Sequence, residues 1–167
     1  RSSAASDVYK RQVIVQCVPY YYKNIDGTFE KYIDGGMYPE YVTITPIEDY
    51  NYVNENPDVI VFQYPYDNYN SAGTTDPVFY SYNLASHTQK LIYIPYFRTD
   101  EIDENDMRAY TNMDAYVTMP GVVYADKVIV QSEEIRKLYI KKLTDFFGEE
   151  SEDEWEDKIE AEDIGGI

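Results

Sequence analysis

The sequence is poor in the residues that build metal centres and disulfide frameworks. It contains one cysteine, Cys17, and one histidine, His87, among its 167 residues. A structural zinc site or a disulfide framework needs several such residues, which argues against both. No Ser-His-Asp set can be assembled around the single histidine, which argues against a hydrolase of that kind. We interpret Cys17, inside an apolar run, as a small buried hydrophobic residue in a reducing compartment.

Basic residues are also scarce, and they form no cluster. The chain has 14 lysines and arginines against 31 aspartates and glutamates, a formal net charge of −17 at pH 7. Nucleic acids and anionic membrane surfaces are bound by clustered Lys and Arg, so neither is expected as a partner. Glycine-rich GxGxxG or GxxxxGK loops are lacking, so a nucleotide phosphate has no backbone cradle in this chain. No run of 18 apolar residues is present, so no membrane-spanning segment is expected.

The remaining composition is that of one folded domain with unusual ends. A hydrophobic fraction of 44% suits a domain that buries about two-thirds of its unfolded surface. Residues 1–12, RSSAASDVYKRQ, lack an initiator Met and any pattern that joins them to Val13, and we interpret them as a non-native leader. Residues 13–148 are predicted to be the domain, with natural sequence expected upstream of it. The acidic residues 149–167 are predicted to be a tail or a linker to a further domain; alternatively, Trp155 docks on that domain.

Short apolar runs rich in β-branched residues predict the strands of a sheet. These runs are VIVQCV (13–18), VIVFQY (59–64), LIYI (91–94) and KVIVQ (127–131). Such runs are typical of parallel strands buried on both faces, so we expect an α/β, Rossmann-like, mostly parallel sheet with helices on both faces. Residues 41–45 alternate in polarity and predict an edge or outer strand. Helices are predicted over residues 77–89, 103–117, 120–125 and 132–148.

Three of these runs end in the same dipeptide, Pro-Tyr, at residues 19–20, 65–66 and 95–96. Proline cannot donate to the ladder, so it ends a strand, and ligands of parallel sheets bind beyond the carboxyl ends of the strands. We therefore expect the residues after each stop to converge on one edge of the sheet. A tyrosine rim offers flat apolar faces and hydroxyls, which suits a small sugar-like or polyol ligand. The alternative is that tyrosines merely cover the surface of a chain that contains 20 of them.

The candidate site residues are derived from this geometry. The predicted ligand-binding side chains are Tyr20, Tyr66, Tyr69, Tyr96 and Arg98. Asp67 and Asp100 come after two of the Pro-Tyr stops, which makes them candidates for the catalytic general base. Alternatively, each aspartate accepts backbone N–H bonds in its own turn. No metal site is expected.

Three stretches carry a resemblance to a known family. They are PDVIVFQYPYDNYN (57–70), KLIYIPYF (90–97) and above all MPGVVYADKVIVQSEEIRKLY (119–139), and they resemble bacterial proteins of the CDP-glycerol glycerophosphotransferase family. The resemblance covers residues 13–160. It implies an architecture similar to GT-B glycosyltransferases, in which two Rossmann-like domains face each other across a cleft. This chain is similar to the N-terminal domain, which presents strand ends to the acceptor.

The resemblance also implies a function. It points to a transferase of cell-wall polymer (teichoic acid) or glycan synthesis that acts from the cytoplasmic side on a small polyol or sugar-like acceptor. No cofactor is expected in this chain, because the nucleotide-linked donor, CDP-glycerol or a nucleotide sugar, would bind a C-terminal domain outside it. Peripheral membrane association is expected only through parts outside the chain. The chain alone is therefore expected to be inactive.

One position departs from the family. Relatives often read GVVHADKVIVQSE, whereas this chain has Tyr124 in place of the histidine. If that histidine is catalytic, the activity of this chain is in doubt; if it is structural, its loss has no bearing on activity. Tyr124 is retained as a candidate binding residue. The competing interpretation is a non-catalytic α/β binding or interaction module that keeps the fold and the tyrosine rim, and neither interpretation predicts an oligomeric state.

Overall fold

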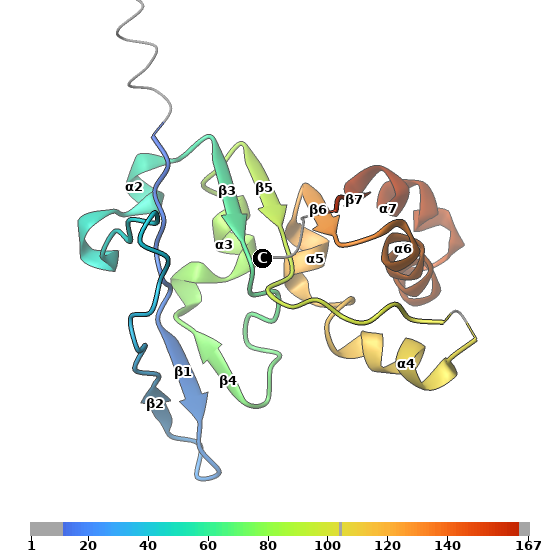
Figure 1. Cartoon of the computed structure of the whole chain (residues 1–167), viewed down its shortest axis with the longest axis horizontal. Helices are drawn as coiled ribbons and strands as arrows, with labels where there is room; N and C mark the ends of the chain where they lie inside the picture. Colours follow the sequence, from blue (N-terminus) through green and yellow to red (C-terminus); the bar gives the residue numbers. More distant parts are fainter. Residues whose placement is uncertain (1–11, 104, 164–167) are drawn as a thin grey trace, which may run out of the picture.

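The computed structural model describes residues 12–103 and 105–163, which contain two β-sheets and a layer of helices (Figure 1). One sheet is parallel, with the strand order β3-β5-β6-β7, and the other is antiparallel, with the order β2-β1-β4. The parallel strands are β3 (Val59–Phe62), β5 (Lys90–Tyr93), β6 (Lys127–Val130) and β7 (Ile159–Ala161). The antiparallel strands are β1 (Tyr20–Lys23), β2 (Phe29–Lys31) and β4 (Gly73–Thr75). Three of the four predicted parallel strands are thereby confirmed.

Short helical segments connect the strands. They are η1 (Ile47–Asp49), α2 (Tyr52–Glu55), η2 (Pro77–Phe79), α3 (Ser81–Ala85), α4 (Met107–Asn112), η3 (Met113–Ala115), α5 (Pro120–Tyr124), α6 (Glu133–Phe147), η4 (Glu149–Ser151) and α7 (Glu152–Lys158). The helices predicted over 120–125 and 132–148 are confirmed. Those predicted over 77–89 and 103–117 are each split into a 3-10 turn and a short α-helix. No described helix has both the length and the apolar character needed to cross a membrane.

The long helix α6 begins and ends as its sequence predicts. The Ser132 hydroxyl accepts a hydrogen bond from the Ile135 N–H at 3.2 Å, which satisfies one of the free donors of the first turn. Gly148 comes directly after the helix with φ of +111°, a conformation that residues with a side chain rarely adopt. Leu138 and Leu143 are among its buried residues, so the predicted apolar stripe is the face that packs.

One face of the parallel sheet carries the core. The register opposes Ile60 to Leu91, Tyr93 to Val128 and Val128 to Ile159, so these side chains share a face. Four of them, all but Ile60, are fully buried, and they cluster with side chains of α3, α5, α6 and α7. In Figure 1 the helices α3 and α5 accordingly lie behind the strands.

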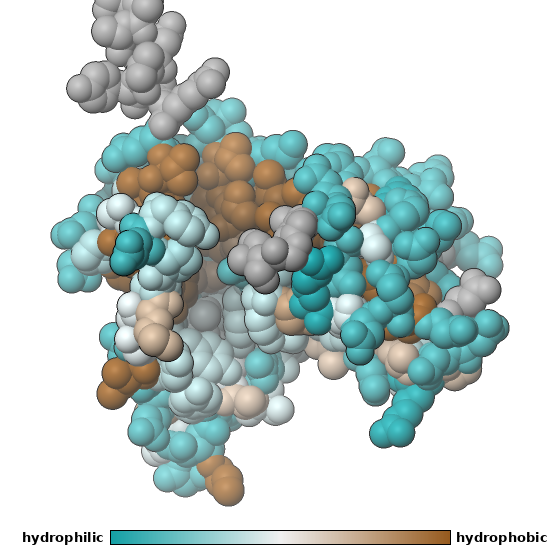
Figure 2. Space-filling view, viewed as in Figure 1, coloured by the Kyte–Doolittle hydropathy of each residue, from teal (hydrophilic) through white to brown (hydrophobic). Residues whose placement is uncertain are grey.

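The opposite face of the parallel sheet is bare. Val59 and Val61 point to it and are 48% and 55% exposed, and Ile92, paired with Val61, is only partly buried. Figure 2 shows apolar side chains gathered over β3 and β5 on the side turned to the viewer. The prediction of helices on both faces is therefore wrong for the described part of the chain. The strands do have two apolar faces, but only one of them is covered.

The order of the strands explains why one face is covered. From β3 through β5 and β6 to β7, each new strand is added on the same side of the previous one. Parallel connections are right-handed, so successive steps in one direction place every crossover helix on the same face. A sheet receives helices on both faces only when the chain also adds strands in the opposite direction.

The segment predicted as the first parallel strand, residues 13–18, is not a strand. It runs extended, but its hydrogen bonds go to a loop: the Val15 carbonyl accepts from the Thr45 N–H at 2.7 Å. The side-chain amide of Gln16 donates to the backbone carbonyls of Pro46 and Tyr50. Apolar composition allows a segment to enter a sheet, but a strand also needs a pairing partner, and none of the described strands pairs with this one.

Two further expectations about this region are wrong. Residues 41–45, predicted to be an edge strand, belong to no ladder of the described residues. Cys17 is exposed rather than buried, because the segment that carries it does not enter the core. Pro19, expected to end a strand, directly precedes β1, so the first Pro-Tyr pair opens an antiparallel strand.

The acidic stretch after α6 belongs to the fold. We expected a solvated tail or linker from residue 149 onward, but α7 packs on α6 and β7 pairs with β6 in parallel. Trp155 is 3% exposed, and its indole N–H donates to the Ser151 hydroxyl at 2.8 Å. It therefore docks within this domain and not on another. Residues 164–167, and nearly all of the predicted leader 1–12, lie outside the described residues.

Candidate functional site

A hollow of about 300 Å³ lies where the two sheets meet, beyond the C-terminal ends of β3 and β5. Its lining residues are Tyr20, Gln63, Tyr64, Asn70 and Tyr96. They are supplied by β1, by the loop after β3 and by the segment after β5. We call it the tyrosine hollow. Ligands of parallel sheets bind at this edge, so the position agrees with the prediction even though one contributing strand differs.

Tyr20 reaches the hollow from the antiparallel sheet. β1 pairs with β4, which opposes Tyr20 to Thr75. A side chain at Gly73 would overlap the ring and hydroxyl of Tyr20, so glycine is needed for the ring to lie against the β4 backbone. The Tyr64 hydroxyl donates to the Gly73 carbonyl at 3.1 Å, and the rings of Tyr20 and Tyr64 are 5.8 Å apart. These contacts join the two sheets at the hollow.

Aromatic contacts continue along the edge from the hollow. The rings of Tyr64 and Tyr66 meet edge to face with centroids 5.1 Å apart. The ring of Tyr96 packs on that of Phe97, with centroids 5.0 Å apart, and the ring of Phe97 packs on that of Tyr116, with centroids 5.1 Å apart. Gly121, at the start of α5, donates its N–H to the Pro65 carbonyl at 2.8 Å, which anchors the second Pro-Tyr stop. The edge is therefore an ordered aromatic surface.

The hydroxyls of Tyr64 and Tyr66 stay protonated at neutral pH. Burial raises the pKa of Tyr64 above its ordinary value, and the neighbouring Tyr20 adds to the effect. Burial also raises the pKa of Tyr66, with a further contribution from its hydrogen bond with Tyr96. A neutral phenol can donate one hydrogen bond and accept others. The hollow therefore offers uncharged hydroxyls, two amide side chains and flat apolar faces.

Asp67 lies on this loop but is turned away from the solvent, with 4% of its surface exposed. One carboxylate oxygen accepts from the Ser81 N–H at 2.9 Å and the other from the Ser81 hydroxyl at 2.7 Å. Asp67 has φ of +49°, a left-handed conformation that aspartate tolerates better than most residues. Burial raises its pKa, and the bonds from Ser81 oppose this rise. Its side chain thus ties the loop to the start of α3.

The other predicted residues are spread around the edge. Asp100 and Arg98 are exposed on the segment that follows β5, and Arg98 borders a second, smaller cavity of about 40 Å³. Tyr69 is 72% exposed and does not line the hollow. Tyr124 is exposed on α5, with its ring 6.2 Å from that of Tyr82 in the helical layer. Of the predicted set, Tyr20 and Tyr96 line the hollow. Tyr66 lies beside it, with its ring packed on that of Tyr64, and the other predicted residues do not line it.

Sequence reasoning missed three residues that line the hollow and one that shapes it. Gln63 and Tyr64 were assigned to the strand 59–64, but β3 ends at Phe62, which leaves both in the loop. Proline at position 65 is the signal that could have suggested this, since proline cannot donate to the ladder and therefore limits how far the strand extends toward it. Asn70 and Gly73 carry no comparable signal, because their role depends on the pairing of β4 with β1.

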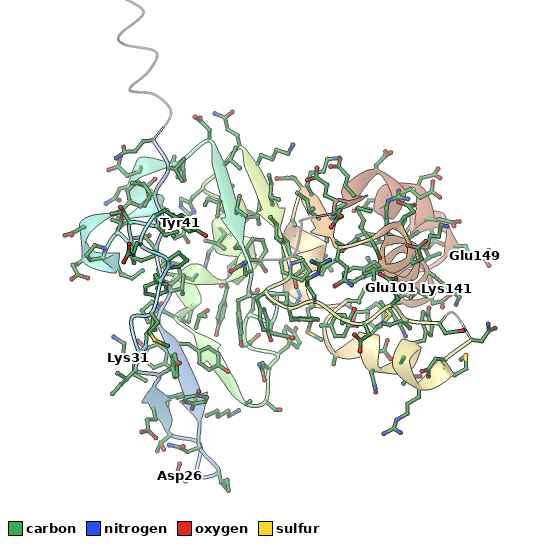
Figure 3. All side chains as sticks on the ribbon, viewed as in Figure 1. Asp26, Lys31, Tyr41, Glu101, Lys141 and Glu149 are labelled. Atoms are coloured by element: carbon green, nitrogen blue, oxygen red, sulfur yellow. The ribbon has the colours of Figure 1, made fainter. Side chains whose placement is uncertain are left out.

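Charged side chains surround this edge without forming a metal centre. In Figure 3, Asp26 lies at the outer tip of the β1–β2 hairpin, Lys31 lies at the other end of β2, where it pairs with Tyr21, and Glu101 lies toward the helices on the other side. No group of three or more His, Cys, Asp or Glu side chains among residues 12–103 and 105–163 is placed to hold a metal ion. Comparison with protein-family models, with curated proteins and with solved structures finds no match for this chain.

Proposed function

We propose that this chain binds a small polyhydroxylated molecule, a sugar or a polyol, in the tyrosine hollow. The observation that carries the proposal is the lining itself: three tyrosines and the two amides Gln63 and Asn70 around about 300 Å³. Tyrosine faces pack on the C–H faces of sugars, and hydroxyls and amides can donate to and accept from neighbouring hydroxyls of the ligand. The volume is at the lower end of small-molecule sites.

The charge of the hollow supports a neutral ligand. Its five lining side chains are three tyrosines and two amides, and amides do not ionise. The pKa values of Tyr20 and Tyr64 are raised above the ordinary tyrosine value, so both hydroxyls are neutral near pH 7. The whole chain carries −17, which disfavours an anionic ligand by long-range repulsion. An uncharged hydroxylated group therefore fits better than a phosphate or a carboxylate.

We further propose that the bound molecule is the acceptor of a transferase, with the nucleotide-linked donor held outside this chain. This step rests on the resemblance to CDP-glycerol glycerophosphotransferases and on the position of the hollow at the C-terminal edge of a parallel sheet. Asp100, exposed on the segment after β5, is the better candidate for the general base. Asp67 is the poorer one, because both of its carboxylate oxygens are occupied by Ser81.

A non-catalytic binding module is the second candidate. It is favoured by the hydrogen bonds between Asp67 and Ser81, which occupy both carboxylate oxygens. It is also favoured by the position of His87, whose ring contacts the Asn83 carbonyl and Tyr52 in the helical layer and not the hollow. Turnover of CDP-glycerol by the longer polypeptide would support the transferase, and ligand binding without turnover would support the module. Under both proposals the chain alone is inactive.

Saturation-transfer NMR with glycerol and D-glucose as probes tests the binding proposal. Tyr96→Ala should reduce the transfer signal by most of its value, because the ring lines the hollow while its side chain is 56% exposed and adds little to the core. Tyr82→Ala, a similarly exposed tyrosine on α3, is the matched control and should leave the signal unchanged. Equal losses in both variants would show that the tyrosines act only as surface cover.

A further inference from the structure

A continuous series of five tyrosine rings passes through the tyrosine hollow and leads away from it. In spatial order its members are Tyr66, Tyr64, Tyr20, Tyr22 and Tyr32. The centroids of successive rings are 5.1, 5.8, 5.4 and 5.8 Å apart, and each pair meets edge to face. We call this series the tyrosine row. Tyr64 and Tyr20 also line the hollow, so the row continues the candidate site beyond the volume of the hollow itself.

The outer half of the row lies on one face of the antiparallel sheet. Tyr20 and Tyr22 are two positions apart in β1, so their side chains point to the same face. The Tyr32 N–H donates to the Tyr20 carbonyl at 2.8 Å, which places Tyr32 opposite Tyr20 and on that face as well. Figure 1 shows this sheet extending away from the parallel sheet, with β2 on its outer side. The row therefore runs from the edge of one sheet across the face of the other.

The row becomes more open with distance from the hollow. Tyr64 and Tyr66 are partly buried, whereas Tyr22 and Tyr32 are 46% and 48% exposed. Single exposed aromatic side chains are common on protein surfaces, but adjoining ones form a patch of the kind that marks an interaction site. Here the adjoining rings also continue a concave site. We therefore interpret the outer rings as part of a binding surface.

The charges on this sheet indicate which ligand suits the surface. Glu30 pairs with Tyr22 and so shares the tyrosine face, whereas Lys23, Lys31 and Phe29 alternate with these residues and lie on the opposite face. A polyanion thus finds a carboxylate and no cation from β1 or β2 along the row. Each ring of the row combines a flat apolar face with a hydroxyl. An uncharged ligand that also combines apolar faces with hydroxyls fits this surface better than a polyphosphate or an apolar helix.

The length of the row indicates that the ligand is a chain. A sugar ring is comparable in size to one phenol ring, so a single unit in the hollow leaves Tyr22 and Tyr32 without contact. We propose that the tyrosine row binds a linear, uncharged oligosaccharide. Its end unit occupies the hollow, and the units that follow lie on Tyr20, Tyr22 and Tyr32. This rests on the proposed function, because the end unit is the ligand of the hollow, and it names that ligand as the end of a chain.

The test compares D-glucose with three uncharged chains of glucose, maltohexaose, cellohexaose and laminarihexaose, by NMR titration of the whole chain. At least one hexasaccharide should bind about tenfold more tightly than glucose, because each further ring contact adds binding energy. Tyr22→Ala and Tyr32→Ala should each remove most of this gain and leave glucose binding unchanged, since neither ring lines the hollow. Both side chains are about half exposed, so the variants should fold, which thermal unfolding checks.

The matched control is Tyr41→Ala, because Tyr41 is an 84% exposed tyrosine that lies apart from Lys31 of β2 (Figure 3). Equal loss in the control and in Tyr22→Ala would overturn the row. Binding of glucose without a gain for any hexasaccharide would also overturn it and would leave the proposed function intact, whereas lack of binding by all four sugars would overturn both. Binding of decaproline that depends on Tyr22, without hexasaccharide binding, would identify a groove for proline-rich peptides and overturn the proposed ligand.

Discussion

The two faces of the parallel sheet are built from similar residues but have different environments. Leu91, Tyr93 and Val128 on one face are fully buried, while Val59 and Val61 on the other are about half exposed. Both sets are branched or aromatic and come from apolar runs of the same kind. The difference shows that an apolar strand is able to be covered on both faces, but its composition does not say which face is covered. The path of the chain decides which face receives the helices.

The largest effect is expected on the covered face. Leu91→Ala should destabilise the protein by about 3 kcal/mol, the sum of lost burial and the cavity left behind, since the side chain is fully buried between the sheet and α3. The measurement is the free energy of unfolding from urea titration. A loss below about 1 kcal/mol would mean that this face is not the core.

The second-largest loss of stability is expected in the loop after β3, which carries Asp67. Asp67→Ala should cost about 2 kcal/mol, because the buried Ser81 N–H and hydroxyl would lose their acceptors. Asp67→Asn is the control, because an amide can still accept from the N–H and tolerates the left-handed backbone of φ +49°. Equal losses in both variants would assign the effect to the charge instead of the hydrogen bonds.

The difference in stability between wild type and Asp67→Asn is expected to depend on pH. Burial holds the folded pKa of Asp67 above its ordinary value of 3.8. The stabilising contribution of a carboxyl group with a raised folded pKa is complete below its unfolded pKa and is lost as the pH rises through the folded pKa. Asp67→Asn cannot ionise, so its stability relative to wild type should increase from acidic to neutral pH. Urea titrations at both pH values measure this; a constant difference would contradict the raised pKa.

A smaller effect of opposite sign is expected at Tyr93, in the middle of the covered face. Its hydroxyl is buried and has no hydrogen-bond partner among the described residues. Tyr93→Phe removes this unpaired group and leaves the ring in place, so the variant should be as stable as wild type or more stable by up to about 1 kcal/mol. Thermal unfolding measures the change. A clear loss of stability would show that the hydroxyl is bonded, for example through a buried water.

The smallest effect is expected on the bare face. Val61→Thr keeps the β-branched shape of the side chain and should change the stability of the chain by less than about 0.5 kcal/mol, as surface substitutions do, because Val61 is 55% exposed. Comparison with Leu91→Ala then measures the contrast between the two faces of one sheet. A loss comparable to that of Leu91→Ala would mean that the bare face is already covered in solution.

The tyrosine hollow was predictable in its location and only partly in its members. Pro65 and Pro95 come after strands that end at one edge of the parallel sheet, so Tyr66 and Tyr96 could be placed there from the sequence. Tyr20 was placed in the right region for a wrong reason, since it arrives on an antiparallel strand. Asp67 was expected to face a ligand but bonds to Ser81, fourteen positions away in the chain, a pairing that no local pattern predicts.

The sequence by itself determined the local elements whose signals lie within one segment. The strands β3, β5 and β6 are encoded in their apolar runs, and α6 is encoded in its cap at Ser132, its apolar stripe and Gly148. Only the tertiary structure decided that residues 13–18 stay outside the sheet, that the acidic stretch after α6 enters it, and that one face is left bare. The physical reason is that capping and periodicity are interactions between near neighbours, whereas strand pairing and coverage depend on which distant segments are available to meet.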